Sequence, residues 1–239
     1  MSYKQLCKVN NLLTIFQIFP QLYALYISFF YLFWLSIAND KHINDLKMKN
    51  IAIFASGNGS NAENITNYFA NNSDIRVACF LCNNPKAGVI ARAERLGIPC
   101  LVFSRDDINN SSLVIDFLRQ HDIYYIVLGG FLWLLPSSLT DIYNERIVNI
   151  HPSLLPKYGG KGMYGDKVHE AVIAAGEKES GITIHRINEK YDDGAIICQK
   201  TCPVLPDDTP DTLASRVHAL EYEWFPKVIE QDILALSSL

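Results

Sequence analysis

The stretch that decides the fold is Ile51-Ala52-Ile53-Phe54-Ala55-Ser56-Gly57-Asn58-Gly59-Ser60-Asn61. Its first five residues form a short apolar run, typical of a buried strand, and the glycine-rich residues after it predict a turn into a helix. Glycines let a backbone approach a ligand closely, and the free N–H groups of a first helical turn favour an anion. We therefore expect a phosphate-binding turn here, with a ligand-free tight turn as the alternative.

Two features of the same turn bear on that choice. Ser60 and Glu63 have the spacing of a capping box, which would give the turn a purely structural reason to exist. A dinucleotide site is disfavoured, because Ala62 stands where the third glycine of the fingerprint would be. In addition, the second expected strand leads into Asn83-Asn84-Pro85, which offers no acidic side chain to hold a ribose.

Strand and helix patterns alternate along the chain from Met48 onward. Strands are expected at 51–55, 77–81, 101–103, 123–128, 147–150, 182–187 and 195–198, and helices at 61–68, 88–97, 111–120, 166–175 and 210–235. Such alternation predicts an α/β fold with a mainly parallel, doubly wound, Rossmann-like sheet that binds ligands at the carboxyl ends of its strands. At 239 residues and 49% hydrophobic, the chain is long enough for one sizeable domain of this kind.

Residues 1–47 differ from the rest and are expected to form an apolar N-terminal extension to a domain at 48–239. Between Val9 and Asn39 there is no charged residue. We favour a mis-called start codon or an irrelevant extension, because the α/β pattern begins at Met48. A membrane anchor at 9–39 is one alternative, and a cleaved signal peptide ending at Ser36-x-Ala38 is another. A cytoplasmic location is expected, with membrane association only if 9–39 is a genuine anchor.

Charge and cysteine content exclude some classes of function. A net charge of -4 and a pI near 5.8 leave no positive excess for long nucleic acid, whereas a small phosphorylated ligand remains open. The cysteine pairs 79/82 and 198/202 have ligand-like spacing. Both pairs fall in expected strands, so we predict buried reduced thiols rather than zinc or disulfides, and no metal.

Two polar residues end the strand expected at 147–150. Asn149 and His151 are two apart, so their side chains leave the same face at the edge where such sheets bind ligands. An amide N–H and an imidazole are suitable donors for a tetrahedral oxyanion, and Pro152 and Pro156 restrict the chain that follows. The alternative is that Asn149 caps a turn and His151 is a satisfied core histidine.

Further polar residues downstream could join this pair. Asp192 lies in a turn between two expected strands, where acids are usually just solvated, but it could orient His151 if the turn folds over that edge. Thr183 and His185 are two apart on the following strand and could face the same cleft, with His185 in a supporting place. His169 is either a surface residue or a substrate contact.

Three of these motifs together resemble the phosphoribosylglycinamide formyltransferase family. They are the turn at 56–61, the run Asn149-Ile150-His151-Pro152-Ser153-Leu154-Leu155-Pro156, and Asp192-Asp193-Gly194. The resemblance covers essentially all of 48–239. It implies a formyltransferase-type sheet with an antiparallel C-terminal part and a C-terminal helix. It also implies transfer of a formyl group from 10-formyltetrahydrofolate to glycinamide ribonucleotide in purine synthesis, without a metal.

The resemblance assigns roles to matched positions. Asn149, His151 and Asp192 would be catalytic, with protonated His151 and Asn149 stabilising an oxyanion and Asp192 raising the pKa of His151. The other assigned positions are Gly59, Ser60 and Asn61 for the substrate phosphate, Glu221 for the substrate, and Leu132, Trp133, Leu134, Leu135, Asn188, Glu189, Lys190 and Tyr191 for the folate.

The chain departs from the better-known bacterial form in a longer, glycine-rich segment at 159–165, in Trp133 at a basic position, and in Asp193 at a glycine position. The rival enzymes are methionyl-tRNA formyltransferase, formyltetrahydrofolate deformylase and a sugar-nucleotide formyltransferase. The first two normally carry further domains for which this chain has no matching segment. A membrane-tethered folate or nucleotide binder is the rival from another class, although it would have no use for a proton relay.

Overall fold

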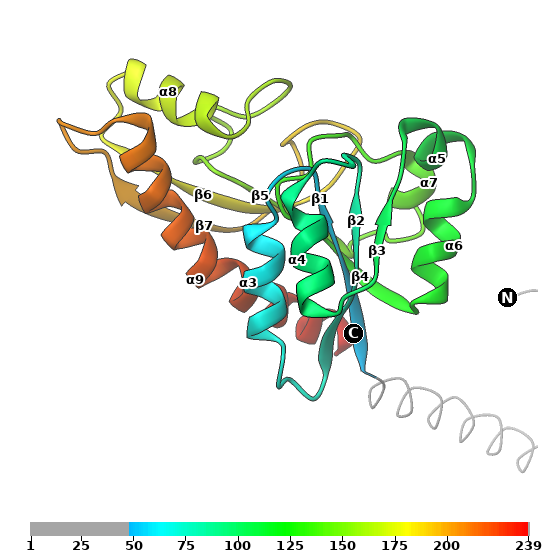
Figure 1. The fold of residues 1–239 in the computed structure, drawn as a ribbon. Coiled ribbons are helices and arrows are strands. Elements are labelled where there is room, and N and C mark those ends of the chain that lie inside the picture. Colours follow the sequence, from blue (N-terminus) through cyan, green and yellow to red (C-terminus); the bar gives the residue numbers. More distant parts are fainter. Residues whose placement is uncertain (1–47, 239) are drawn as a thin grey trace, which may run out of the picture. The chain divides into compact units, whose positions relative to one another are not determined.

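A seven-stranded sheet runs through residues 48–238, the part of the chain that this computed structural model describes (Figure 1). The strand order is β3-β2-β1-β4-β5-β6-β7. The strands are β1 (Lys49–Ala55), β2 (Ile75–Cys82), β3 (Cys100–Val102), β4 (Ile123–Leu128), β5 (Ile147–His151), β6 (Glu179–Arg186) and β7 (Ile196–Pro203). The first five are parallel, and β6 and β7 are antiparallel, so the expected sheet is confirmed. Our expectations for residues 1–47 lie outside the described residues.

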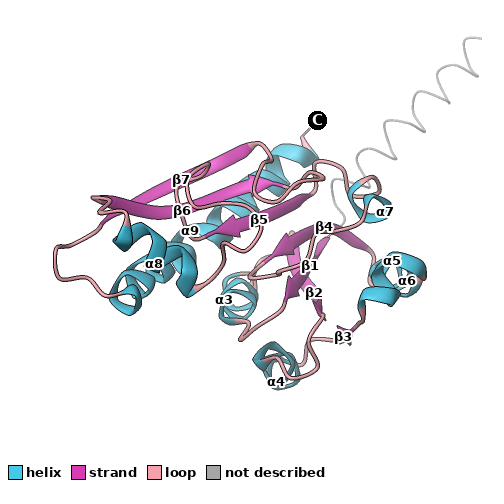
Figure 2. Ribbon diagram, turned by 90° about the horizontal axis from the view of Figure 1, so that it is seen from above, coloured by secondary structure: helices cyan, strands magenta, loops and turns pink. Residues whose placement is uncertain are grey.

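Helices cover both faces of this sheet, as Figure 2 shows from above. One apolar cluster joins the sheet to α3 (Ser60–Tyr68), α4 (Gly88–Leu96), α8 (Asp166–Ala174) and α9 (Pro210–Ser237). A second cluster, on the other face, joins it to α5 (Arg105–Asn110), α6 (Leu113–Gln120) and α7 (Ser137–Thr140). All expected helices are present to within about two residues at their ends, while α5 and α7 are short helices that the patterns did not indicate.

Strand β1 lies in the middle of the sheet and is buried on both faces. Ile51 and Ile53 belong to one apolar cluster, and Ala52 and Phe54 belong to the other. Burying the side chains of Ile51, Ile53 and Phe54 contributes roughly 1.5–3 kcal/mol each, and burial on both faces explains why this strand reads as a continuous apolar run. The chain leaves β1 toward β2 and β3 and then returns to β4 on the other side. The carboxyl ends of β1 and β4 therefore flank a topological switch point, where ligands bind in open α/β sheets.

A buried ionic network ties the C-terminal helix to the sheet. Arg186, at the end of β6, pairs with Asp232 of α9 through two contacts, Nη1 to Oδ2 at 2.6 Å and Nη2 to Oδ1 at 2.7 Å. Tyr125 of β4 also donates its hydroxyl proton to Asp232 and accepts from Arg186 at 3.1 Å. The Arg186 and Asp232 side chains are only 14% and 11% exposed, so each charge depends on its partners in place of water; Arg186 Nε also lies 3.4 Å from Oε2 of the exposed Glu145.

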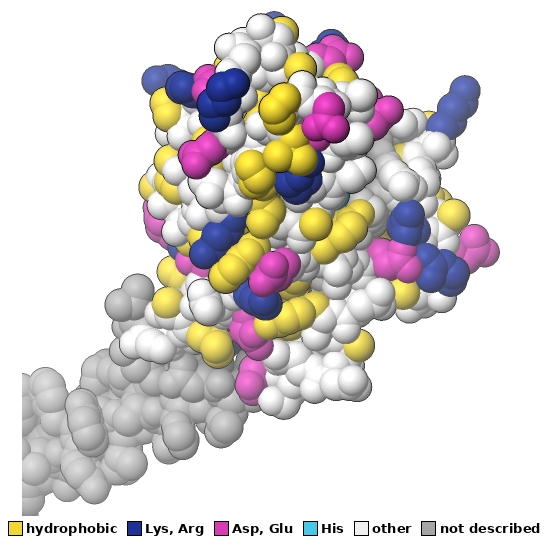
Figure 3. Space-filling model, turned by 90° about the vertical axis from the view of Figure 1, so that its left-hand side faces the viewer, with side chains coloured by type: hydrophobic (Ala, Val, Ile, Leu, Met, Phe, Trp, Pro, Cys, Tyr) yellow, Lys and Arg dark blue, Asp and Glu magenta, His cyan; other side chains and the backbone are white. Residues whose placement is uncertain are grey.

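The surface and the cysteines are ordinary for such a fold. Figure 3 shows apolar side chains scattered among acidic and basic ones, without a broad region of one charge on that face.

The five cysteines between residues 48 and 238 are free thiols; Cys79, Cys82 and Cys202 are buried, and Cys100 and Cys198 are half-buried. Burial raises the pKa of Cys79 to about 12, so that thiol is protonated at neutral pH. None of the helices between residues 48 and 238 combines the length and apolar character of a membrane span.

We predict that Asp232→Ala lowers the free energy of unfolding by about 3 kcal/mol, because it leaves the largely buried Arg186 guanidinium with only the exposed Glu145 carboxylate, 3.4 Å from Nε, as a counter-charge. Urea denaturation monitored by circular dichroism measures this loss. The matched control is Glu223→Ala, which breaks the exposed Glu223–Lys227 pair on the same helix and should cost less than about 0.5 kcal/mol. Equal losses in the two variants would contradict the structural role of the buried network.

Candidate active site

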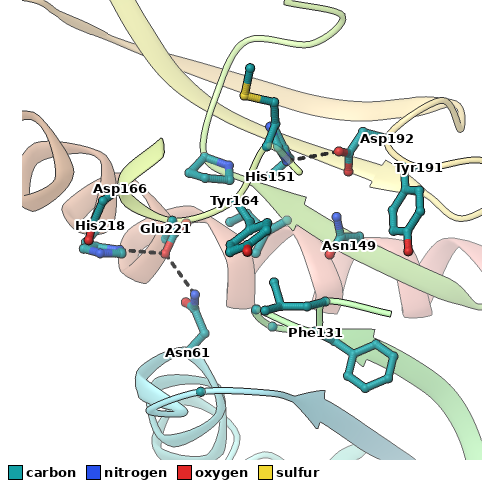
Figure 4. Close-up of a pocket in the computed structure, with 18 of the residues that line it drawn as sticks. Asn61, Phe131, Asn149, His151, Tyr164, Asp166, Tyr191, Asp192, His218 and Glu221 are labelled. Carbon is teal, nitrogen blue, oxygen red and sulfur yellow. Dashed lines mark hydrogen bonds and ion pairs between the residues drawn. The ribbon is translucent and has the colours of Figure 1, made fainter. Parts of the chain in front are cut away.

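A cavity of about 460 Å³ opens at the carboxyl ends of the central strands. Its walls come from the turn after β1, the ends of β4 and β5, the loop at 160–165, the turn before β7, and helices α8 and α9 (Figure 4). The cavity thus lies at the topological switch point, and it contains both the glycine-rich turn and the polar end of β5. Among the residues expected to act, Gly59, Ser60, Asn61, Leu132, Asn149, His151, Tyr191, Asp192 and Glu221 line it.

The turn after β1 presents the start of α3 to the cavity. Gly59 is the N-cap, with a left-handed φ of 75°, and Ser60 is the first helical residue. A Cβ on Gly59 would lie 2.5 Å from Val89 Cγ2, so both the backbone and the packing require glycine here. The expected Ser60–Glu63 capping box is wrong, because the helix begins at Ser60, one residue earlier than that motif needs, and Gly59 is the N-cap. The Glu63 carboxylate instead pairs with Arg92 and Arg95. The free N–H groups of this turn remain available to an anion.

The sheet brings Asn149, His151 and Asp192 together. Asn149 and His151 lie at the end of β5, between the parallel β4 and the antiparallel β6. Asp192, in the turn between β6 and β7, points its carboxylate at the imidazole, with Oδ2 3.5 Å from His151 Nδ1 (Figure 4). The same oxygen accepts a 2.8 Å hydrogen bond from the Gly160 N–H. The turn at 190–194 therefore folds over the edge of β5, which sequence spacing could not establish.

The glycine-rich loop allows this close approach. A Cβ on Gly159 would lie 3.2 Å from Asp192 Cβ and 2.4 Å from a methyl group of Leu155. Asp192 itself adopts a left-handed φ of 54°, which aspartate tolerates better than most residues. The glycine-rich segment at 159–165, in which this chain departs from the better-known bacterial form, therefore gives the Asp192 carboxylate room to lie beside His151.

Burial disfavours the charged forms of both His151 and Asp192, but it prevails only at His151. The pKa of His151 lies below its ordinary value, because the ring is 4% exposed and burial disfavours the cation more than the Asp192 carboxylate and the Tyr158 carbonyl favour it. Asp192 acts to raise this pKa, as expected, but burial outweighs its effect and the net shift is downward. Burial acts to raise the pKa of Asp192, but the contacts with His185 and His151 and the Gly160 hydrogen bond outweigh it and lower that pKa. The resting site therefore holds an ionised Asp192 beside a largely neutral His151 at neutral pH.

Both nitrogens of His151 face acceptors. Nε2 lies 2.8 Å from the carbonyl oxygen of Tyr158, which can only accept, so Nε2 carries the proton in the neutral ring. Nδ1 then presents its lone pair toward Asp192. Uptake of a proton would place an N–H between the ring and that carboxylate, so the pair is arranged to share an incoming proton.

His185 and Thr183 lie behind the cavity rather than in its lining. His185 is opposite Asn149 in the β5–β6 pairing, and its Nε2 is 3.1 Å from Asn149 Nδ2. Because His185 Nδ1 donates to the Arg186 carbonyl at 2.8 Å, Nε2 of the neutral ring accepts from Asn149 and fixes the direction of its amide. The Thr183 hydroxyl donates to the Ser153 carbonyl and accepts from the Leu155 N–H, which holds the proline-bounded loop in place.

A second polar group occupies the end of the cavity near α3. Glu221 of α9 is 4% exposed, and its Oε2 accepts from Asn61 Nδ2 at 2.9 Å and from His218 Nδ1 at 3.0 Å (Figure 4). His169, 1% exposed, also lines the cavity. The sequence reasoning missed His218, although its spacing of three from Glu221 on an expected helix places both side chains on one face.

The residues expected to hold the folate are placed unevenly. Leu132 and Tyr191 line the cavity and are 43% and 37% exposed. Leu135 belongs to the apolar core, and Trp133 packs on Phe103 with the Arg105 guanidinium 4.0 Å above its ring. The expected positions that do not line the cavity are Trp133, Leu134, Leu135, Asn188, Glu189 and Lys190. The lining residues that the sequence reasoning did not single out include Phe131, Met163 and Tyr164.

No three histidine, cysteine or acidic side chains within residues 48–238 are arranged to hold a metal ion. The amide, imidazole and carboxylate groups that line the cavity can form hydrogen bonds, stabilise charge and transfer protons. Asn61, at the end of the glycine-rich turn, and Tyr191 lie on opposite sides of the cavity (Figure 4).

Comparison with known proteins identifies the family. The formyl transferase family model matches residues 49–229. Phosphoribosylglycinamide formyltransferase of Bacillus subtilis (strain 168) is 40% identical over 189 residues, covering 77% of this chain and 94% of that protein. The chloroplastic enzyme of that name from Arabidopsis thaliana is 39% identical over 197 residues, covering 80% and 67%. Glycinamide ribonucleotide transformylase 1 from Geobacillus kaustophilus matches in structure with a TM-score of 0.69 at 36% identity, covering 77% and 97%. The chain belongs to the phosphoribosylglycinamide formyltransferase family.

Proposed function

We propose that this protein transfers the formyl group of 10-formyltetrahydrofolate to the amine of glycinamide ribonucleotide, a step of purine synthesis. The observation that supports this most directly is the convergence of the Asn149 amide, the His151 imidazole and the Asp192 carboxylate beside an anion-binding turn. These are the groups that acyl transfer to an amine requires: a donor for an oxyanion and a route for a proton. We assign this activity to the domain at 48–239 and place it in the cytoplasm.

In the proposed reaction, the substrate amine attacks the formyl carbon and the carbonyl oxygen becomes an oxyanion. The second N–H of the Asn149 amide, the one not bound to His185, is available to that oxygen. As negative charge develops there, it favours the imidazolium form of His151, which burial disfavours in the resting site. The new carbon–nitrogen bond forms as the bond from carbon to N10 of the folate breaks.

Proton transfer completes the exchange. The attacking nitrogen loses one proton and N10 of the folate gains one, and His151 with Asp192 would carry it between them. In the structure, the His151 Nε2–H donates to the Tyr158 carbonyl. An oxyanion that binds the same N–H must therefore share it with this carbonyl or displace the carbonyl. Movement of the 158–160 segment would accompany this change, since Gly160 also binds Asp192.

The two substrates would occupy opposite ends of the cavity. The ribonucleotide phosphate fits the turn at Gly59, Ser60 and Asn61, where unpaired N–H groups and the helix dipole favour an anion. Glu221 would contact the sugar or the glycinamide portion. The pterin would lie toward Leu132 and Tyr191, whose exposed apolar surfaces suit an aromatic ring system.

The rival activities share this chemistry and differ in the acceptor. A deformylase would use water in place of the amine, and a tRNA or sugar-nucleotide enzyme would use a larger amine. We test the acceptor by offering the purified protein glycinamide ribonucleotide, methionyl-tRNA or no amine, and measuring loss of the formyl group from the folate. Turnover that requires glycinamide ribonucleotide is the expected result, whereas folate binding without turnover would favour a binding protein.

Asn149→Ala and Asp192→Asn are each expected to lower kcat by about a hundredfold or more, because one donor to the oxyanion is worth about 3 kcal/mol and the proton route needs its carboxylate. Steady-state formyl transfer measures this effect, and circular dichroism verifies folding. The matched control is Asp193→Asn, which changes the neighbouring acid; its side chain is 56% exposed and should leave kcat within about twofold. Near-normal turnover in Asp192→Asn would exclude the proposed relay.

The balance of burial and charge at His151 predicts a particular titration. By NMR, the His151 ring should titrate below 6.5, because burial outweighs the attraction of Asp192. In Asp192→Asn it should titrate lower still, since the opposing carboxylate charge is gone while the burial remains. The His151 ring takes up a proton less readily in the folded chain than in the unfolded chain, so the free energy of unfolding falls as the pH drops below 6.5. The contribution of this ring to stability is therefore largest above that pH. A pKa that rises in Asp192→Asn would contradict this account.

A further inference from the structure

The His151 ring lies between two acceptors that compete for its proton. Nε2 lies 2.8 Å from the carbonyl oxygen of Tyr158, and Nδ1 lies 3.5 Å from Asp192 Oδ2. A neutral imidazole has one N–H, so it can donate to only one of these two acceptors. The proton stays on Nε2 while the Tyr158 carbonyl keeps its place. Without that carbonyl, the charged Asp192 carboxylate is the better acceptor and draws the proton to Nδ1.

The backbone that presents this carbonyl adopts an unfavourable conformation. Tyr158 has a left-handed φ of 54°, which a bulky aromatic residue rarely adopts. Such a conformation persists only where the surrounding contacts hold it. Two residues further on, the Gly160 N–H donates to Asp192 Oδ2 at 2.8 Å. The short segment 158–160 therefore contacts both His151 and Asp192, and a group that holds Tyr158 also fixes the surroundings of this pair.

One carboxylate outside the cavity holds the Tyr158 side chain. The Tyr158 hydroxyl donates to Glu177 Oε1 at 3.0 Å, and the Lys157 ammonium donates to the same oxygen at 2.8 Å. These hydrogen bonds, that from Lys157 first, lower the pKa of Glu177, so the carboxylate is ionised at neutral pH. Burial raises the pKa of Tyr158 and the contact with Glu177 adds to the rise, so the hydroxyl keeps its proton and remains a donor.

The end of α8 fixes the position of Glu177. Gly176 has a left-handed φ of 67°, and its N–H donates to the Ile173 carbonyl at 2.9 Å. The Glu177 N–H donates to the Val172 carbonyl at 3.3 Å. These two bonds form a Schellman motif, which ends the helix and fixes the backbone at Glu177. The Glu177 side chain is 27% exposed, and neither it nor Tyr158 is among the described residues that line the cavity.

We propose that Glu177 is a positioning residue that sets the tautomer of His151 through its hydrogen bond with Tyr158. With this contact in place, His151 carries its proton on Nε2 and presents the Nδ1 lone pair to Asp192, as the proposed proton route requires. Without it, the proton moves to Nδ1, and Nε2 has no N–H to donate to an oxyanion. The inference rests on the proposed function for the oxyanion, whereas the tautomer can be measured without any substrate.

Nitrogen NMR of the isotope-labelled full chain tests the proposal, because it distinguishes the ring nitrogen that carries the proton from the one that does not. At about pH 8 the His151 ring is neutral, and the wild type should show the Nε2–H form. Glu177→Ala and Tyr158→Phe should each shift most of the ring population to the Nδ1–H form. Glu177→Gln keeps an acceptor oxygen for the tyrosine hydroxyl and should retain the wild-type form. The matched control is Glu179→Ala, which removes an exposed acid of the same segment and should not change the tautomer.

Steady-state formyl transfer gives a second, independent readout. Glu177→Ala and Tyr158→Phe should lower kcat by about tenfold, which is the effect of losing one hydrogen bond. The KM for each substrate should stay within about twofold, because neither side chain lines the cavity. Glu177→Gln should keep kcat within about twofold of the wild type. Circular dichroism verifies that each variant is folded.

The outcomes separate this proposal from the assigned activity. An Nδ1–H ring in the wild type, or an Nε2–H ring in folded Glu177→Ala and Tyr158→Phe, would overturn the role of Glu177 even if formyl transfer is observed. The expected change of tautomer without formyl transfer by the wild type would support the positioning of His151 and overturn the proposed function. A raised KM for both substrates with an unchanged tautomer would show a general disturbance of the cavity and would also contradict the proposal.

Discussion

A carboxylate that is buried has to be matched by donors, and the candidate active site is built around this requirement at Asp192. The side chain is 12% exposed, the Gly160 N–H donates to it at 2.8 Å, and the His151 and His185 rings lie 3.5 and 3.6 Å away, so that protonation of His151 would add a second donor. Each of these comes from a different segment: the loop after β5, the end of β5 and the end of β6. Placing the Asp192 carboxylate here therefore requires the antiparallel pairing of β5 with β6 and the turn before β7. It also requires glycine at position 159, where a Cβ would come too close to Leu155 and Asp192.

Burial and charge act against each other throughout the cavity, and the balance differs from one histidine to the next. His151 is deeply buried, so its cation is disfavoured despite the neighbouring acid. His218 is half exposed and bonded to an acid, so its cation is favoured. The pKa of a histidine can thus be lowered in one part of the cavity and raised in another, because the degree of burial and the nearest partner differ.

Much of the fold could be predicted from the sequence, and the reasons are local. The apolar run at 51–55 and the alternation after it indicate a parallel sheet, since strands buried on both faces have that composition. The pairing of Asn149 with His151 on one face follows from the two-residue period of a strand. Contacts between segments far apart in the chain did not follow: nothing in the spacing shows that Asp192 reaches His151, or that α3 and α9 meet at Asn61 and Glu221. The start of α3 was displaced by one residue, because a glycine in the left-handed region, rather than Ser60, ends the turn.

The collision between position 59 and Val89 has an evolutionary consequence. A side chain at 59 is opposed twice, by the sign of φ and by the methyl groups of the next helix, whereas a Cβ at Gly57 would meet nothing within 4 Å. Two glycines separated by one residue in the same loop are thus under very different selection. Sequence drift can replace the first at little structural cost, whereas the second is expected to stay glycine even in a lineage where Val89 becomes smaller, because the positive φ and the Val89 Cα at 2.9 Å would remain.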